Sequence, residues 1–203
     1  MMLRGLIALL FIGKLFSAQA QASNEQWLTG LNAYWEEINA EYSDPMHSPL
    51  LAEDRSHFTE LERFEPNSTF AVTAQFKAKK GKEFGMRTST DRMPIYQTVG
   101  RLSFKINGKK YKLTAYRNVE LGKQEEYANY YFVPFTDLTN GDDTYGGGRY
   151  IDLEGPLEKN VALDFNRAYN PYCAYNAKYS CPVPPSGNHL NIKVLAGVKM
   201  AHE

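Results

Sequence analysis

The sequence is poor in cysteine and tryptophan, with two of each among 203 residues, and it carries no excess charge, because 23 basic residues balance 23 acidic ones. The missing positive charge argues against a nucleic-acid partner, since neutralising phosphates requires a basic surface. No apolar run reaches the roughly 20 residues that a spanning helix needs, so we predict no membrane span in the mature chain. With 43% hydrophobic residues, the composition is that of a globular chain.

The sequence also lacks the short motifs that mark well-known classes of enzyme. It contains no Gly-x-Ser-x-Gly elbow, no His-Glu-x-x-His zinc helix, no Walker motif and no spaced dinucleotide glycines. We therefore predict no cofactor and no metal, and the motifs leave open whether the chain is an enzyme.

The first 22 residues have the features of a secretory signal peptide. Arg4 supplies a short positive start, an apolar stretch from Leu6 to Phe16 follows, and Ala20-Gln21-Ala22 meets the small-x-small rule. We expect cleavage after Ala22, with Ala20 as the alternative, and an extracytoplasmic mature protein, periplasmic or secreted. Residues 23–203 are then expected to form a single β-rich domain.

Local patterns predict a helix followed by strands. Ser23 and Gln26 form a capping box, and the apolar spacing after them predicts a helix from Asn24 to Glu41 that Asp44-Pro45 ends. Ser48-Pro49 resembles the start of a second, short helix. Alternating residues predict strands near 70–77, 83–88, 95–99, 130–135, 161–165 and 192–198.

A β-hairpin is the clearest single element. Asn107-Gly108 is the favoured two-residue type I′ turn, and it sets Phe104 opposite Tyr111 and Leu102 opposite Leu113. We predict a mainly β fold: an antiparallel barrel or sandwich of seven to eight strands with an N-terminal α-helix packed against it.

Aromatic residues are concentrated in residues 127–179, which hold nine of the 14 tyrosines. Two segments there, TYGGGRYIDL from Thr144 and LDFNRAYNPYCAYNAKYSC from Leu163, mix aromatics with charged and amide side chains. Such a mixture favours a polar-lined cleft over a plain core.

These two segments, together with the closing NIKVLAGVK, resemble the bacterial and archaeal family catalogued as domain of unknown function 1684. The SPL at Ser48 is similar to that family's entry segment, so the likeness covers most of residues 40–199. The resemblance implies a shared fold and a shared site, and it implies no substrate.

From the clustered polar side chains we predict that a small polar or anionic molecule binds in a cleft lined by tyrosine and arginine. The bidentate forks of two arginines suit a carboxylate or phosphate, so replacing both by Ala is expected to abolish binding and leave the melting temperature nearly unchanged. The candidate ligand-binding residues are Tyr145, Arg149, Asp152, Asp164, Asn166, Arg167, Tyr169 and Asn170.

Alternative interpretations of the same residues remain open. Arg149 and Arg167 can instead form structural salt bridges with Asp152 and Asp164. The triple glycine before Arg149 can be a turn that needs positive φ angles, rather than a loop that approaches a ligand. A hydrolase-type enzyme with Asp152 or Asp164 as acid or base, or an interaction module without a ligand, would use the same region.

Cys173 and Cys181 are the two cysteines. In an oxidising compartment the expected arrangement is a disulfide that closes the small loop between them. A zinc site with His189 lacks a fourth ligand, and a reactive thiol would need a base that the sequence does not reveal.

Overall fold

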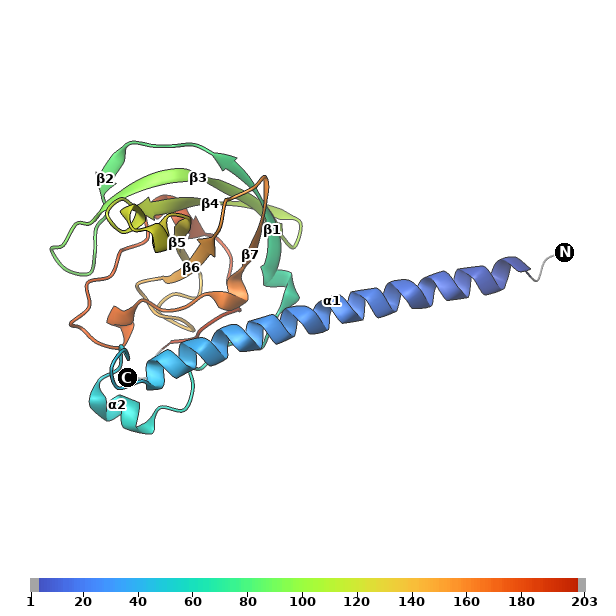
Figure 1. The fold of residues 1–203 in the computed structure, drawn as a ribbon, viewed down its shortest axis with the longest axis horizontal. Helices are drawn as coiled ribbons and strands as arrows, with labels where there is room; N and C mark the ends of the chain where they lie inside the picture. Colours follow the sequence, from blue (N-terminus) through green and yellow to red (C-terminus); the bar gives the residue numbers. More distant parts are fainter. Residues whose placement is uncertain (1–3, 201–203) are drawn as a thin grey trace. The chain divides into compact units, whose positions relative to one another are not determined.

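The computed structural model describes residues 4–200, with side chains from residue 21 onward. The chain divides into two compact units, Met1–Ile38 and Asn39–Glu203. Helix α1 (Arg4–Ser43) forms the first unit, and its last turn belongs to the second (Figure 1). The predicted helix is confirmed and ends before Asp44-Pro45, but it begins at Arg4, so Ser23 does not cap it.

The predicted signal peptide lies partly on residues 1–3, outside the described residues, and partly on the backbone of α1, so its cleavage stays a prediction. Within residues 4–200, no helix combines the length and the apolar character that crossing a bilayer requires.

Among its described residues, the second unit contains one further α-helix, six short 3-10 helices and a series of strands. Its helix begins at Ala52 rather than at Ser48, because the Ser48 hydroxyl instead donates to the Tyr42 carbonyl. The elements are α2 (Ala52–His57), β1 (Ala71–Ala78), β2 (Glu83–Gly85), β3 (Ile95–Ile106), β4 (Lys109–Asn118), β5 (Tyr130–Asp137), β6 (Arg149–Glu154), β7 (Asn160–Asp164) and β8 (His189–Leu190).

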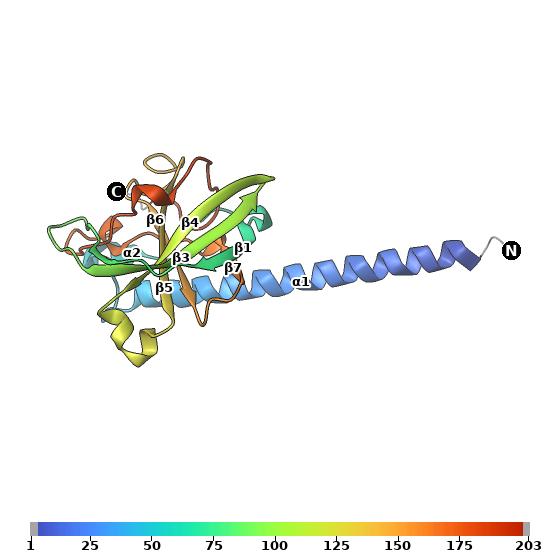
Figure 2. The same ribbon diagram turned by 90° about the horizontal axis from the view of Figure 1, so that it is seen from above.

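The eight strands of the described chain form one curled sheet, a half-barrel with the order β6-β5-β4-β3-β1-β7 (Figures 1 and 2). Neighbouring strands on this path are antiparallel, β2 pairs with β3, and the short β8 adds to β5 in parallel. The mainly β, antiparallel prediction is confirmed, with a curled open sheet in place of the closed barrel or the sandwich.

The predicted hairpin is confirmed in turn type and register. Asn107 and Gly108 both have positive φ, at 49° and 76°, as a type I′ turn requires. Phe104 lies opposite Tyr111 and Leu102 lies opposite Leu113. The turn residues and the alternating pattern therefore specify the same pairing.

A β-bulge in β3 divides that strand between two faces of the sheet. The register against β4 shifts between Thr98 and Gly100, so even-numbered residues change face there. Beyond the bulge, Leu102 and Phe104 join the main core, while Tyr96 before it joins a second group of buried residues.

We call this second group the tyrosine cluster. It lies on the face of β5 and β6 opposite the main core, because alternate residues of a strand point to opposite faces. On β6, Ile151 and Leu153 belong to the main core and Tyr150 to the cluster. The tyrosine cluster comprises Met86, Tyr96, Tyr116, Phe132 and Tyr150, with Phe84, Tyr130 and Tyr169 packed against it.

The strand predicted at 192–198 is wrong. The expected alternation of buried side chains is present, because Val194, Ala196 and Val198 are all buried. However, the carbonyl oxygens of these three residues accept hydrogen bonds from the Arg149 guanidinium, so they do not form a ladder with a neighbouring strand.

Candidate functional site

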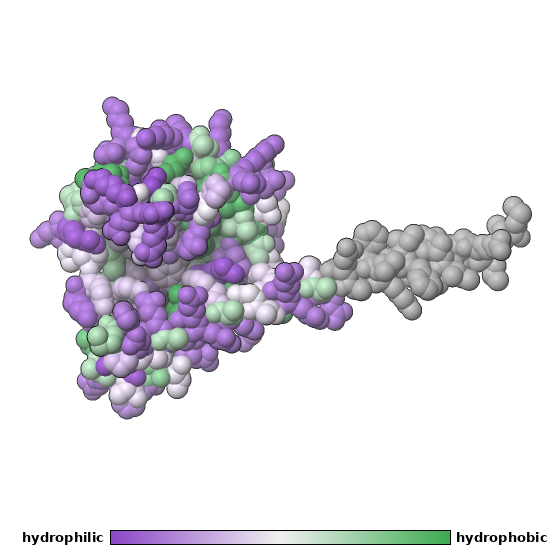
Figure 3. All heavy atoms as spheres, in the orientation of Figure 1, coloured by the Kyte–Doolittle hydropathy of each residue, from purple (hydrophilic) through white to green (hydrophobic). Residues whose placement is uncertain are grey.

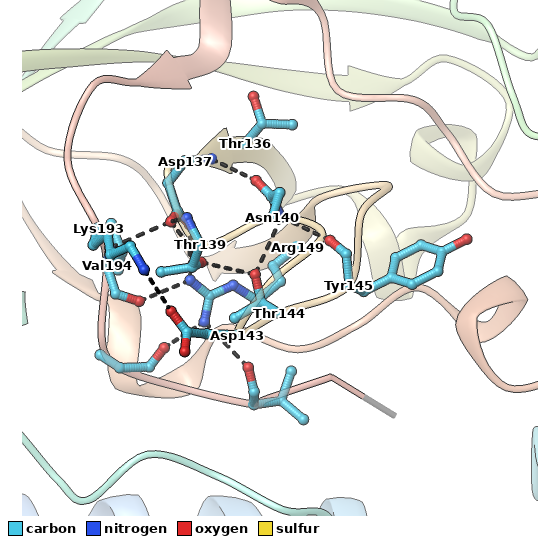
Figure 4. A network of polar contacts seen from close by, with 12 residues as sticks. Thr136, Asp137, Thr139, Asn140, Asp143, Thr144, Tyr145, Arg149, Lys193 and Val194 are labelled. Carbon is cyan, nitrogen blue, oxygen red and sulfur yellow. Dashed lines mark hydrogen bonds and ion pairs between the residues drawn. The ribbon is translucent and has the colours of Figure 1, made fainter. Parts of the chain in front are cut away.

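Arg149, at the start of β6, is completely buried and is surrounded by acceptors from the protein itself. Its Nη2 donates to Asp137 Oδ2 at 2.8 Å and to the Val194 carbonyl at 2.9 Å, and its Nη1 donates to the carbonyls of Ala196 and Val198 (Figure 4). Burial lowers the pKa of Arg149, and the charge of Asp137 opposes that shift. The guanidinium thus ties the C-terminal segment to the sheet.

The acid that pairs with Arg149 is Asp137, and not Asp152 or Asp164 as the alternative interpretation of the sequence suggested. Residues 149 and 152 are three apart on one strand, so their side chains point to opposite faces. Asp137, at the end of β5, instead has the same parity as the core residues Val133 and Phe135. This parity was the available signal for a buried acid facing the core.

The loop between β5 and β6 is closed by its own polar groups. Asp137 Oδ1 accepts from the backbone and hydroxyl of Thr139, and the Asn140 amide donates to the Tyr145 carbonyl (Figure 4). Asp142 and Asp143, which with Asp137 and Asn140 give this loop its oxygen-rich sequence, both form ion pairs with Lys193. In the described chain, no group of three or more His, Cys, Asp or Glu side chains is arranged to hold a metal ion.

The triple glycine contains one position that demands glycine. Gly148 has a φ of 91°, and a Cβ there would lie 2.6 Å from the Phe135 carbonyl oxygen. Gly146 is exposed and would meet nothing closer than 3.8 Å. Gly148 therefore fits the interpretation of a tight turn before a strand. Tyr145, just before the glycines, directs its hydroxyl toward the Cys173 sulfur, 3.8 Å away.

The DFNRAYN segment, residues 164–170, fastens other parts of the chain. Asp164 Oδ1 accepts from the backbone and side-chain amides of Asn166, and Asn166 in turn exchanges two hydrogen bonds with the backbone of Asn67. Asn170 is buried and donates to the Lys199 carbonyl. Arg167 is exposed while Arg149 is buried, so the two arginines do not share one cleft.

Asp152 and Tyr169 are the predicted site residues that the fold brings together on the tyrosine cluster. Tyr150 and Tyr169 pair through two backbone hydrogen bonds, which carry the Tyr169 side chain to the outer face of β6. There its hydroxyl donates to Asp152 Oδ2 at 2.5 Å. The other oxygen, Oδ1, is buried and accepts no hydrogen bond within the described chain.

The environment of Asp152 is aromatic, and among the described residues no cationic side chain forms an ion pair with its carboxyl. Burial raises the pKa of Asp152 to about 6, and the nearby hydroxyls of Tyr130 and Tyr169 partly offset that rise. Burial likewise raises the pKa of Tyr130, and the negative charge of Asp152 adds to the effect. Tyr130 was absent from the sequence-based list, and its even spacing from Phe132 on β5 was the only signal for it.

The predicted disulfide between Cys173 and Cys181 is wrong, since both cysteines are free thiols. The loop between them is nevertheless closed: the Cys173 backbone N–H donates to the Cys181 sulfur at 3.2 Å. The Cys181 backbone donates to the Ser89 hydroxyl, which fixes the loop against the segment after β2. Hydrogen bonds thus close the loop that we expected a covalent bond to close.

Comparison with known proteins yields a matching family model and a similar solved structure. A family model described as "Protein of unknown function (DUF1684)" matches residues 56–199. The chain is similar to the solution NMR structure of the uncharacterized protein from gene locus rrnAC0354 of Haloarcula marismortui, with 34% sequence identity and a TM-score of 0.69. That alignment covers 88% of this chain and 96% of the other. No curated protein matches the sequence.

Proposed function

The chain belongs to the DUF1684 family of proteins of unknown function, and we propose that it binds a small polar molecule beside Asp152, on the tyrosine-cluster face of β5 and β6. The observation that carries this proposal is the unused oxygen of Asp152, which is buried and accepts no hydrogen bond within the described chain. A buried acceptor without a donor is costly, by about 1–3 kcal/mol, unless a ligand or solvent supplies the donor.

The chemistry around Asp152 selects the kind of ligand. A carboxylate offers only acceptors, so the complementary group is an N–H or O–H donor. The neighbouring rings of Tyr130 and Tyr169 present electron-rich faces, which favour a cationic nitrogen. An anion is disfavoured, because the guanidinium that we first assigned to it, Arg149, is buried on the other face. We therefore propose a small amine or amide.

The face of the molecule in the space-filling view is mainly hydrophilic, with smaller hydrophobic areas between the polar side chains (Figure 3). Asp152 itself is only half-buried as a residue, although its Oδ1 is out of contact with solvent.

Methylammonium and acetamide are suitable probes, because both are small and carry N–H donors, methylammonium as a cation and acetamide as a neutral amide. In an NMR titration of the full chain at pH 7.5, methylammonium is expected to shift the ring signals of Tyr130 and Tyr169 in a saturable way. D152N should remove this effect, because it replaces the anionic acceptor by a neutral amide.

Asp164 provides the matched control, because its Oδ1 is already engaged by Asn166. D164N should leave the titration with methylammonium unchanged. Equal shifts in wild type and D152N, or no saturable shift with either probe, would contradict the proposed binding site.

A second candidate is acid–base catalysis by Asp152 at the same place. A carboxyl group with a pKa of about 6 exchanges its proton near neutral pH, which general acid–base chemistry requires. Hydrolysis of a panel of chromogenic esters, amides and glycosides by the full chain tests this candidate. Activity that D152N abolishes, with a half-maximum near pH 6, supports it; activity unaffected by D152N opposes it.

We also propose that the chain is exported and cleaved after Ala22. Arg4, the apolar stretch and the small-x-small residues support this proposal. Expression in a bacterial host, followed by fractionation and N-terminal sequencing, tests it. A mature chain in the periplasm or medium that begins at Ser23 is the expected result, and an uncleaved cytoplasmic chain would contradict it.

A further inference from the structure

A group of hydrogen-bond donors surrounds the sulfur of Cys173. The residue lies in the 3-10 turn Tyr172–Ala174 and is half-buried. Cys181 lies against it, within hydrogen-bond distance of the Cys173 backbone N–H, and the Tyr145 hydroxyl is 3.8 Å from the Cys173 sulfur. Ser89 holds the backbone of Cys181 and reaches the same sulfur. Three residues, Ser89, Tyr145 and Cys181, thus converge on one thiol.

The two cysteines are chemically unequal. Hydrogen bonding from Cys181, helped by Ser89, Tyr145 and the backbone, lowers the pKa of Cys173 to about 6 against the opposing effect of burial. The proximity of Cys173 and burial raise the pKa of Cys181, so Cys181 keeps its proton and donates it. Near neutral pH the pair therefore consists of one thiolate and one thiol.

We propose that Cys173 is a nucleophile that reacts with hydrogen peroxide or another small hydroperoxide. The Cys173 thiolate attacks one peroxide oxygen, an S–O bond forms and the O–O bond breaks. The sulfur is oxidised to sulfenic acid and the peroxide is reduced. Hydroxide leaves and takes a proton from solvent, so that one thiolate, one peroxide and one proton yield one sulfenic acid and one water. This reaction is independent of the ligand site at Asp152.

The surroundings favour this class of electrophile. The thiolate is the reactive form, and a half-buried cysteine is reached by a molecule as small as a peroxide more readily than by a bulky disulfide. The Tyr145 hydroxyl stays protonated, because burial and the neighbouring Cys173 raise its pKa to about 12. Tyr145 can therefore donate a hydrogen bond to the departing oxygen as negative charge develops on it.

The rate expected for Cys173 follows from two opposing effects. At pH 6 about half of a thiol with a pKa near 6 is thiolate, against well under 1% of an ordinary cysteine with a pKa near 8.5. Its lower basicity reduces its nucleophilicity by roughly tenfold. Cys173 is therefore expected to react about tenfold faster than free cysteine at pH 6.

The test follows the loss of the alkylatable Cys173 thiol in the reduced full chain after addition of hydrogen peroxide, at pH values from 5 to 9, by peptide mass spectrometry. This readout counts every oxidised product of Cys173. The expected rate reaches half of its maximum near pH 6. A rate at pH 6 no greater than that of free cysteine, or a rise only near pH 8–9, would overturn the proposal.

Variants of Cys181 separate a positioning role from a merely structural one. C181S keeps a hydroxyl donor and should keep the low half-point, whereas C181A removes the donor and should move the half-point upward by at least one pH unit. In C181S, dimedone present with the peroxide should be found attached to Cys173. The proposal fails if C181S yields no such adduct, or if C181A and C181S have the same pH profile as wild type.

Discussion

Two buried carboxylates on neighbouring strands have opposite surroundings. Asp137 of β5 faces the main core, where it pairs with Arg149 and accepts from Thr139 and Val194. Asp152 of β6 faces the tyrosine cluster, where one oxygen accepts from Tyr169 and the other from no group of the described chain. The first acid is saturated by the protein, and the second retains capacity for a partner from outside.

The hydrogen-bond partners of a buried polar residue indicate whether its role is structural or functional more clearly than its residue type does. Arg149 and Asp152 were both candidate ligand-binding residues in the sequence. In the structure, however, Arg149 holds the C-terminal segment and is closed to ligands. Asp152 has the raised pKa and the unused hydrogen-bond acceptor that a binding or catalytic group needs. The following predictions test that distinction.

The largest effect is expected from breaking the Arg149–Asp137 pair. R149M leaves Asp137 buried without its counter-ion and frees three backbone carbonyls, so urea denaturation should show a loss of about 3–5 kcal/mol in the free energy of unfolding. The exposed Arg167 is the matched control, and R167A should change this free energy by less than about 1 kcal/mol. Equal losses in the two variants would contradict a structural role specific to Arg149.

Ionisation of Asp152, the acid with an unused oxygen, should reduce the stability of the folded protein. Because the folded-state pKa of Asp152 is raised to about 6, its favourable contribution is fully present below pH 4 and is lost as the pH rises through 6. Relative to D152N, the wild type should therefore lose up to about 3 kcal/mol between pH 4 and pH 7. Denaturation of both proteins across this range measures the difference, and a pH-independent difference would refute the raised pKa.

A smaller effect should come from the turn that presents Arg149 to Asp137. G148A forces a left-handed residue to carry a Cβ beside the Phe135 carbonyl, so a loss of about 2 kcal/mol is expected. G146A, in open space on the same turn, should be neutral or slightly stabilising. Thermal denaturation of the two variants compares them directly. If both lose stability equally, the turn does not depend on the backbone of Gly148.

Elements governed by neighbouring residues were predicted well. The end of α1 before Asp44-Pro45, the alternation of β1 and the register at Asn107-Gly108 all follow from preferences within a few residues. The capping box at Ser23 was misleading, because the helix already extends through it from Arg4.

Elements that depend on distant partners were predicted poorly. The segment 192–198 has strand-like alternation, but its carbonyls bind a guanidinium 45 or more residues earlier in the chain. The bulge in β3 is also invisible in the sequence, although it decides that Tyr96 lies in the tyrosine cluster and Leu102 in the main core. For the site, the predicted residues include Asp152 and Tyr169, which the fold brings together, but they do not include Tyr130.

The sequence by itself determined the fold class, the hairpin and the family of this protein, because turn chemistry, alternation and long motifs are properties of contiguous residues. Only the tertiary structure decided which polar side chains are consumed by the protein and which remain available. Arg149 and Asp152 are three residues apart, yet the pleat of β6 directs one into the core and the other into the tyrosine cluster. What each one then meets is set by segments far away in the chain.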